Sequence, residues 1–226
     1  RYYSFMNGIL PSRRKDGKVF NFDDFTVNGA INCLKHRKKD KPFFMLLAIN
    51  APHPEYQIEK EFYDLIDKSK LQRRIPNIGI DDGKPKMETG LMESLRVSGW
   101  SEERLNEIRT VYLAMCAKVD SQFGSVVKAL RDEGIYDNTV IIVLSDHGDY
   151  TTDYGLVEKS QNCFPDCLTN VPLIIKPQVS CKIESGVHSQ LAELTDLCAT
   201  CYELAGIKSS RVQFGKSLVP AMKDKT

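Results

Sequence analysis

The stretch Thr139-Val-Ile-Ile-Val-Leu-Ser-Asp-His-Gly-Asp149 decides the fold expected for this chain. Its first six residues are apolar or β-branched rather than alternating with charged residues, which is typical of a strand covered on both faces in an α/β sheet. Such sheets bind ligands beyond the carboxyl ends of their strands, where Asp146 and His147 stand. Gly148 would let the backbone turn so that both side chains face one ion. These two residues are candidate metal ligands, although an isolated Asp-His-Gly is more often a capped turn.

Helical and strand patterns alternate on both sides of this stretch. Apolar residues recur at helical spacing after Ser101, a good N-cap, and the pattern ends at Gly134. The sequence therefore predicts an α/β fold with a largely parallel or mixed sheet sandwiched between helices. The other expected elements are a helix from Asp23 or Asp24 to about Lys38, a strand from Phe43 to Ile49, a short helix within 56–67, a surface loop over 73–86, a strand from Val171 to Ile175 and a helix from Asp196 to Ala205.

Composition argues against several classes of partner. A net charge of +1 over 226 residues provides no general field for nucleic acid, and no apolar run approaches the roughly 20 residues of a membrane span. The seven cysteines have no framework spacing and are expected to be mostly buried thiols, with Cys198-Ala-Thr-Cys201 in the core. Free thiols favour a reducing compartment such as the cytoplasm. The location of the whole protein stays unknown, because the Arg1 start shows neither an initiator Met nor a signal sequence.

Several further motifs accompany the Asp-His-Gly stretch in a fixed order. They are Lys41-Pro-Phe-Phe-Met-Leu-Leu-Ala-Ile-Asn-Ala-Pro-His-Pro54, Asp137-Asn-Thr139, Gly155-Leu-Val-Glu-Lys159, Asn170-Val-Pro-Leu-Ile-Ile-Lys176, Leu194-Thr-Asp-Leu-Cys-Ala-Thr-Cys-Tyr-Glu-Leu-Ala-Gly206 and Gly215-Lys-Ser-Leu218. This order resembles the sulfatase family of the alkaline phosphatase superfamily over nearly the whole chain. So many motifs in register make chance a poor explanation.

The resemblance implies roles for particular residues. Asp146 and His147 would complete a divalent metal site, usually of Ca²⁺ in this family, although an imidazole suits Mn²⁺ or Zn²⁺ better. His53, between two prolines, would bind the sulfate and could protonate the leaving oxygen, and Lys159 would neutralise a sulfate oxygen. Asp149 is a candidate to support the metal ligands. Without the resemblance, His53 is a loop histidine and Lys159 a surface lysine.

Other parts of the family's catalytic apparatus have no counterpart in this sequence. Sulfatases carry a formylglycine nucleophile, made from Cys or Ser in a Cys/Ser-x-Pro-x-Arg motif, in an N-terminal third with further aspartate ligands. Ile9-Leu-Pro-Ser-Arg13 has the shape of that motif but an Ile at the modified position. Residues 1–226 are therefore expected to form a single partial sulfatase-type catalytic domain, lacking the nucleophile segment and the C-terminal subdomain. Such a chain should be inactive without the remaining portion of the same enzyme.

The expected activity is hydrolysis of a sugar or aryl sulfate ester, so the expected partner is a sulfated small molecule or carbohydrate. Two alternatives stay open. His147 favours a phosphonate monoester or phosphodiester hydrolase of the same superfamily, whereas Tyr154 stands where those relatives tend to carry another His. The lack of a nucleophile favours a non-catalytic sulfatase-like domain.

Overall fold

The computed structural model describes residues 6–9, 21–77, 83, 86–183 and 185–223. Among these residues, no helix is both long and apolar enough to cross a membrane. The strands and the α-helices are β1 (Met6–Ile9), α1 (Phe22–His36), β2 (Tyr56–Ile58), α2 (Lys60–Tyr63), α3 (Lys86–Leu95), α4 (Glu102–Asp132), β3 (Ile141–Leu144), α5 (Asp166–Thr169), β4 (Leu173–Lys176), α6 (Asp196–Leu204) and α7 (Val219–Lys223).

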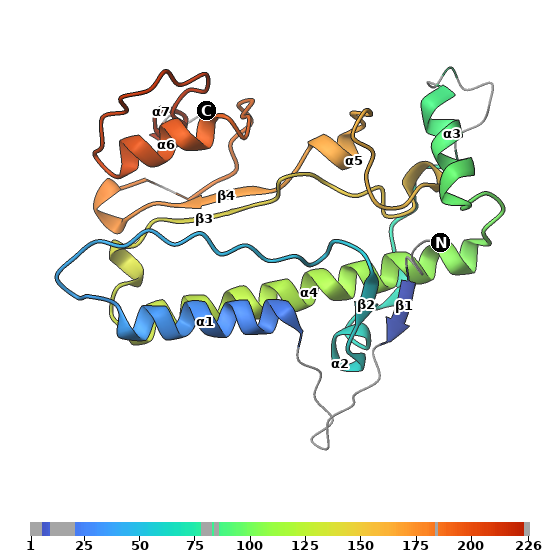
Figure 1. Ribbon diagram of the computed structural model, residues 1–226, viewed down its shortest axis with the longest axis horizontal. Coiled ribbons are helices and arrows are strands. Elements are labelled where there is room, and N and C mark those ends of the chain that lie inside the picture. Colours follow the sequence, from blue (N-terminus) through green and yellow to red (C-terminus); the bar gives the residue numbers. More distant parts are fainter. Residues whose placement is uncertain (1–5, 10–20, 78–82, 84–85, 184, 224–226) are drawn as a thin grey trace. The chain divides into compact units, whose positions relative to one another are not determined.

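The chain divides into two compact units. The first unit combines Arg1–Glu133 with His147–Asn170 and contains β1, β2 and α1 to α5 (Figure 1). The second combines Gly134–Asp146 with Val171–Thr226 and contains β3, β4, α6 and α7. The division falls between Asp146 and His147, so the two candidate metal ligands belong to different units.

α1 begins earlier than expected because a different residue caps it. The Asn21 side chain accepts a hydrogen bond from the Asp24 N–H at 2.9 Å, and the Asp24 carboxylate accepts one from the Asn21 N–H at 3.0 Å. This reciprocal capping box satisfies two N–H groups at the helix start. The expectation that Asp23 or Asp24 is the cap is therefore wrong, and Asp23 is left for a different contact.

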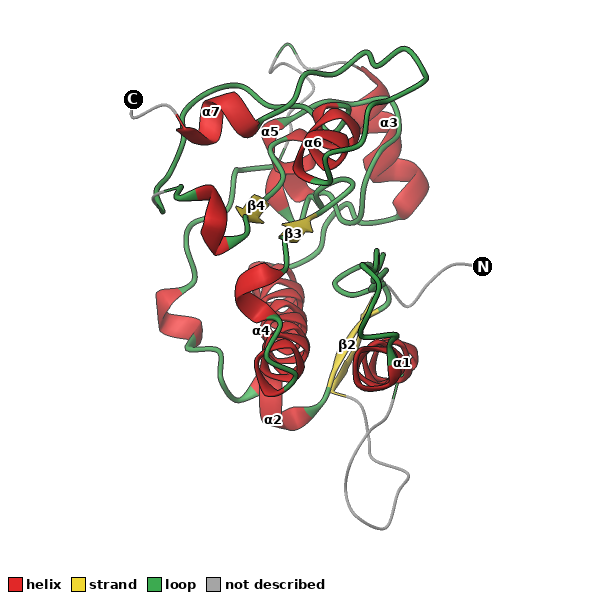
Figure 2. Cartoon of the chain, turned by 90° about the vertical axis from the view of Figure 1, so that its left-hand side faces the viewer, coloured by secondary structure: helices red, strands yellow, loops and turns green. Residues whose placement is uncertain are grey.

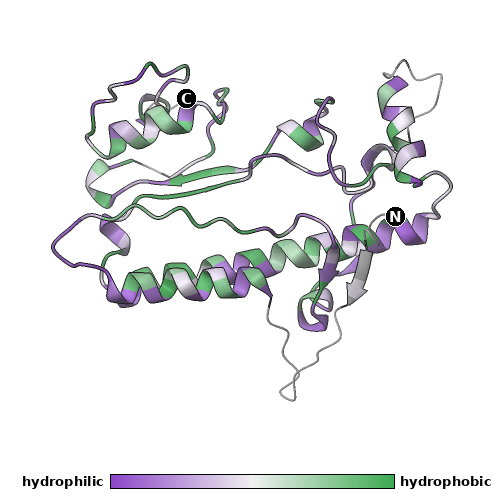
Figure 3. Ribbon diagram, in the orientation of Figure 1, coloured by the Kyte–Doolittle hydropathy of each residue, from purple (hydrophilic) through white to green (hydrophobic). Residues whose placement is uncertain are grey.

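α4 is the central helix of the first unit and has the predicted ends. The Ser101 side chain accepts from the Arg104 N–H at 3.3 Å, and Gly134, with φ +68°, follows the last turn. Apolar and polar residues alternate along α4 (Figure 3), and its apolar side, including Leu105 and Ile108, is buried. α1 and β2 pack against this side, with β2 between the two helices in Figure 2.

The segment before β2 departs from the prediction. Residues 43–49 have no regular secondary structure, so the strand expected from Phe43 to Ile49 is absent, and Phe44 and Leu46 are 85% and 83% exposed. An extended segment becomes a strand only when a neighbour completes its hydrogen-bond ladder. No other described segment pairs with this one. The helix expected within 56–67 is also mostly wrong, because Tyr56–Ile58 is the strand β2, parallel to β1, and only α2 follows.

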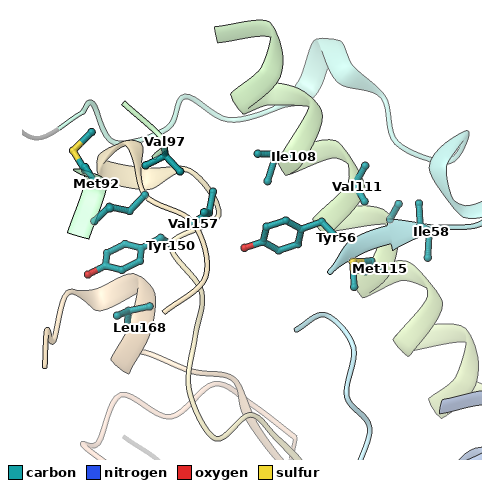
Figure 4. Packing of buried hydrophobic residues seen from close by; sticks show 12 residues of the cluster. Tyr56, Ile58, Met92, Val97, Ile108, Val111, Met115, Tyr150, Val157 and Leu168 are labelled. Carbon is teal, nitrogen blue, oxygen red and sulfur yellow. The ribbon is translucent and has the colours of Figure 1, made fainter. Parts of the chain in front are cut away.

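The core of the first unit joins β2, α3 and α4 to the loop that follows His147 (Figure 4). Tyr56 and Tyr150 are fully buried within it. Large rings contribute much of the buried apolar area in such a cluster. Because Tyr150 belongs to this cluster, the loop after His147 packs against α4 and β2. The other buried members of the cluster include Ile58, Met92, Val97, Ile108, Val111, Met115, Val157 and Leu168.

In the second unit, β3 and β4 occur where strands were predicted. They pair antiparallel, from Ile141 opposite Lys176 to Leu144 opposite Leu173. The described strands thus form one parallel and one antiparallel pair, which makes the sheet structure mixed. Leu144 is 42% exposed, so β3 is not covered on both faces by the described residues. α6 ends just before Gly206, which has φ +65°, as predicted.

The cysteines are less buried than expected. All seven lie in the described ranges and are free, but only Cys163 is buried, while Cys33 and Cys198 are exposed. A helix buries one face only, and α6 buries Thr200 rather than Cys198. The prediction of mostly buried thiols, with Cys198 in the core, is wrong.

Candidate active site

His53 lies on a turn whose backbone is held by a buried residue of α1. Asp23, 4% exposed, accepts hydrogen bonds from the backbone N–H groups of Asn50 and Ala51, both at 2.9 Å. The His53 Nδ1 atom lies 2.7 Å from the Pro54 carbonyl oxygen. Because a carbonyl can only accept, Nδ1 carries a proton, and Nε2 of the neutral ring carries the lone pair.

Lys159 contacts His53 at that lone pair. The Lys159 Nζ atom lies 2.8 Å from His53 Nε2, so the ammonium donates to the imidazole. The Glu158 carboxylate lies beside both, 3.5 Å from Nζ and 3.8 Å from Nε2. The His53 and Lys159 side chains are 38% and 26% exposed, so a solute can reach them. The structure thus brings the two candidate substrate-binding residues together, while their roles in binding stay a prediction.

The loop that carries Lys159 is held in an uncommon backbone conformation. Glu158 has φ +64°, in the left-handed region that non-glycine residues rarely adopt. Its carbonyl accepts from the Tyr150 N–H at 2.8 Å, and its N–H donates to the Tyr56 phenol oxygen at 2.9 Å. These two hydrogen bonds fix the peptide groups on either side of Glu158, the residue directly before Lys159. Such conformations persist where the surrounding structure holds them.

His147 lies close to His53 in the same unit. The two ring centroids are 6.4 Å apart, with an interplanar angle of 68°. The His147 Nδ1 atom lies 2.7 Å from the Gly148 carbonyl oxygen, so Nδ1 is the protonated nitrogen. A backbone acceptor on one ring nitrogen directs the other nitrogen as a potential metal ligand.

Gly148 is required by a close backbone approach rather than by the sharp turn expected from the sequence. A Cβ atom at this position would lie 1.9 Å from the Cys167 carbonyl oxygen and 3.0 Å from the Leu168 Cα atom. The Gly148 N–H donates to the Leu168 carbonyl at 2.8 Å. Only glycine lets the segment after His147 contact the 167–168 backbone in this way.

We expect Gly148→Ala to destabilise the protein by about 2–3 kcal/mol, because backbone atoms must move to admit the methyl group. The measurement is thermal or urea unfolding. Gly124→Ala is the matched control, because the site is an open position in α4 where the added Cβ meets nothing within 4 Å. Alanine should be neutral or stabilising there. Equal stability of the two variants would contradict the close contact.

Asp149 and Tyr56 form a buried pair behind these residues. The Tyr56 phenol lies 2.8 and 2.9 Å from the two Asp149 carboxylate oxygens. The carboxylate also accepts from the Thr151 N–H at 2.7 Å and from its hydroxyl at 3.1 Å. Burial raises the pKa of Asp149 to about 6, against the lowering effect of these hydrogen bonds. Burial and the Asp149 charge raise the pKa of Tyr56 well above its usual value, so the phenol is the donor.

Asp146 follows Ser145 directly after the carboxyl end of β3, as the strand-tip prediction requires. Asp146 belongs to the second compact unit, whereas His53, His147 and Lys159 belong to the first. Asp146 and His147 together offer one oxygen and one nitrogen donor. No group of three or more His, Cys, Asp or Glu residues suited to a metal ion occurs in the described part of the chain. The described residues therefore fit only part of a metal site.

Sequence reasoning missed Tyr56 and the contact of Asp23. Tyr56 was read as a helical residue and Asp23 as a helix cap. The only signal in the sequence is that Tyr56 follows His53, a candidate site residue, by three positions. Their partners are 93 and 27 positions away, beyond any local pattern.

Comparisons with known proteins identify the family and the fold of this chain. A family model described as Sulfatase matches residues 3–207. Arylsulfatase K of Danio rerio is 29% identical over 219 residues, covering 87% of this chain and 40% of that protein. A phosphonate monoester hydrolase from Silicibacter pomeroyi superposes with a TM-score of 0.77 at 21% identity, covering 98% of this chain and 47% of that one. A protein whose structure was solved with its substrate, D-glucosamine-2-N,6-O-disulfate, superposes with a TM-score of 0.71 at 19% identity, covering 90% of this chain and 52% of that one.

The chain thus spans between 40% and 52% of the length of these relatives. The structural likenesses show the shared fold, which is alkaline-phosphatase-like. The family model covers most of the sequence, including the segments of all four candidate site residues. This chain belongs to the sulfatase family.

Proposed function

We propose that the protein containing this chain hydrolyses a sulfate ester, with His53 and Lys159 binding the sulfuryl group. The observation that carries the proposal is the 2.8 Å contact between Lys159 Nζ and His53 Nε2 on two partly exposed side chains. Membership of the sulfatase family supports the same class of reaction. Because the chain spans only part of its relatives, the activity is proposed for the full-length protein.

Lys159 has the chemistry to bind a sulfuryl group. Cleavage of a sulfate ester places negative charge on the sulfuryl oxygens and on the departing oxygen, which favours positioned cationic donors. The ammonium has three N–H bonds, one of which points at His53 Nε2. The others can be directed at a sulfuryl oxygen. The Glu158 carboxylate lies 3.5 Å from the ammonium and is its partner in the absence of substrate.

His53 has a constrained role in proton transfer. Its Nδ1 proton is held by the Pro54 carbonyl, so a proton for the leaving oxygen must come from Nε2. In the present state Nε2 accepts from Lys159, so the ring must gain a proton there before it donates one. We propose that His53 binds the sulfate. Once Lys159 turns its N–H bonds to the sulfuryl oxygens, Nε2 takes a proton from solvent and passes it to the leaving oxygen as the acid of the reaction.

We propose that Asp146 and His147 hold a divalent cation. When bound, the cation would withdraw charge from a sulfate oxygen. The carboxylate suits Ca²⁺, the family's usual ion, whereas the imidazole suits Mn²⁺ better. We propose that the remaining oxygen donors and the formylglycine nucleophile come from parts of the protein outside the described residues. This would explain why the described residues contain no complete set of ligands.

The proposed substrates are aryl or sugar sulfates. The name of the relative from Danio rerio points to aryl sulfates, and the structure solved with a disulfated glucosamine points to sulfated sugars. A phosphonate monoester is the second candidate. The imidazole of His147 and the likeness to the phosphonate monoester hydrolase favour it.

We expect the full-length protein to hydrolyse an aryl sulfate faster than an aryl phosphonate monoester. A chelator should abolish turnover, and Ca²⁺ or Mn²⁺ should restore it. In Asp146→Ala, the concentration of Ca²⁺ or Mn²⁺ that restores half of the turnover should rise at least tenfold, because a hard cation loses a charged ligand. Asp137→Ala, at an exposed aspartate in the same unit, is the control. Faster phosphonate cleavage would support the second candidate, and no cleavage of either ester would indicate a non-catalytic protein.

A further inference from the structure

We infer that Tyr56 is a positioning residue, whose phenol group holds the segments carrying His53, His147 and Lys159 in register with one another. The inference rests on the proposed function for its effect on turnover, whereas the geometry stands independently. All four residues belong to the same compact unit.

The phenol oxygen of Tyr56 makes hydrogen bonds to two different segments. It donates its single proton to the Asp149 carboxylate at 2.8 and 2.9 Å. It accepts from the Glu158 N–H at 2.9 Å. Tyr56 is fully buried, so bulk water does not compete for these contacts.

Each residue that takes part in these hydrogen bonds lies one to three positions from a candidate site residue in the sequence. Tyr56 follows His53 by three positions, and Asp149 follows His147 by two. Glu158 directly precedes Lys159. A single oxygen atom therefore links the three chain segments whose side chains meet at the site. The contacts connect positions 93 and 102 apart in the sequence.

The ring of Tyr56 and its hydroxyl have separable roles. The ring lies beside Ile108 and Val111 of α4, with the hydroxyl directed toward the loop that carries Val157 (Figure 4). It also packs edge-on against Tyr112, with centroids 6.2 Å apart. Phenylalanine would keep this packing and remove only the hydrogen bonds. The Asp149 carboxylate would then keep only its hydrogen bonds with Thr151, and the Glu158 N–H would lose the partner that holds it. The loop would move so that water could replace the phenol.

Such a movement has a specific kinetic consequence. The Lys159 ammonium contacts His53 Nε2 at 2.8 Å, and the Tyr56 phenol holds the backbone of Glu158, from which the Lys159 residue continues. A displacement of about 1 Å at a reacting group can cost on the order of 100-fold in rate. Binding of the remainder of the substrate does not depend on this alignment. The loss should therefore appear in kcat more than in KM.

A second tyrosine provides a matched control. The Tyr63 phenol also donates to a carboxylate, that of Glu107, and accepts from a charged donor, Lys68. It lies in the same unit, and the two hydrogen-bond partners of its hydroxyl lie outside the segments that carry His53, His147 and Lys159. Tyr63→Phe therefore removes a similar set of hydrogen bonds without touching the site.

The test compares full-length Tyr56→Phe and Tyr63→Phe on an aryl sulfate. We expect kcat to fall about 10–100-fold for Tyr56→Phe with KM changed less than about threefold, and both constants to stay unchanged for Tyr63→Phe. Asp149→Asn, which keeps the phenol, should give a similar loss. The double variant should lose no more than either single variant, because both changes break the same link.

A spectroscopic measurement separates this inference from the proposed activity. Side-chain ¹⁵N signals of His53 and His147 should shift in Tyr56→Phe and in Asp149→Asn, but not in Tyr63→Phe. If the wild-type protein cleaves no sulfate ester, the proposed function fails and these signals alone decide the inference. Should Tyr56→Phe not fold, Asp149→Asn decides it in the same way. Unchanged histidine signals, or a loss confined to KM, would overturn the positioning role.

Discussion

Full-length protein carrying Lys159→Ala is expected to lose about 100–1000-fold in kcat/KM for an aryl sulfate. The ammonium donates to His53 Nε2 at 2.8 Å and lies where a sulfuryl oxygen could take a second N–H. Its removal takes one cationic partner away from the developing negative charge, and it also removes the N–H group that faces His53 Nε2. Steady-state kinetics measure the effect, with thermal unfolding as the check that the fold is intact.

Two further variants make this result specific. Lys128→Ala is the control, because that ammonium forms a helix-surface pair with Asp132 and its side chain is 74% exposed. Its kcat/KM should match that of the wild type. Lys159→Arg should be intermediate, since a planar guanidinium keeps the charge but cannot reproduce the point contact with His53 Nε2. Activity of Lys159→Ala within twofold of Lys128→Ala would remove Lys159 from the site.

His53→Ala is expected to have an effect that depends on the leaving group. If the ring donates a proton to the departing oxygen, the loss should be about 100–10,000-fold for a poor leaving group such as an alkyl or phenyl alcohol. For 4-nitrophenyl sulfate, whose leaving group needs little protonation, the loss should be much smaller. The measurement uses a series of aryl sulfates whose leaving groups differ in pKa. The rate of the variant should depend more steeply on the leaving-group pKa than the rate of the wild type.

The alternatives for His53 are distinguished by the same series. An equal loss for every leaving group would show that His53 binds sulfate without acting as an acid. His36→Ala is the control, because that exposed imidazole lies 2.9 Å from the Asn32 carbonyl oxygen of its own helix. No loss for any ester would show that the contact between His53 and Lys159 has no part in turnover.

Local patterns predicted the helices best. α4 was placed from Ser101 to Gly134, and both signals act where expected, because helix capping and helical spacing depend on residues within one or two turns. α6 followed the same rule up to Gly206. The start of α1 was misplaced only because Asn21, rather than Asp23, reaches the N–H of Asp24.

Strands were predicted less well, because a strand depends on a partner elsewhere in the chain. The apolar runs of β3 and β4 were found, but their antiparallel pairing was not. The equally apolar segment 43–49 forms no strand among the described residues. Tyr56–Ile58 becomes a strand through pairing with β1, which no pattern near Tyr56 indicates.

For the candidate site, the sequence by itself determined the family and the four residue types: an aspartate and a histidine at a strand tip, a histidine between prolines and a lysine after a glycine loop. These are motifs of adjacent residues, so they can be read along the chain. Only the tertiary structure decided that Lys159 donates to His53, that Asp23 holds the His53 turn and that Tyr56 links the surrounding loops. Those contacts join positions 27 to 106 apart. Hydrogen bonds over such separations depend on how the core brings buried groups within about 3 Å, and no local spacing encodes that distance.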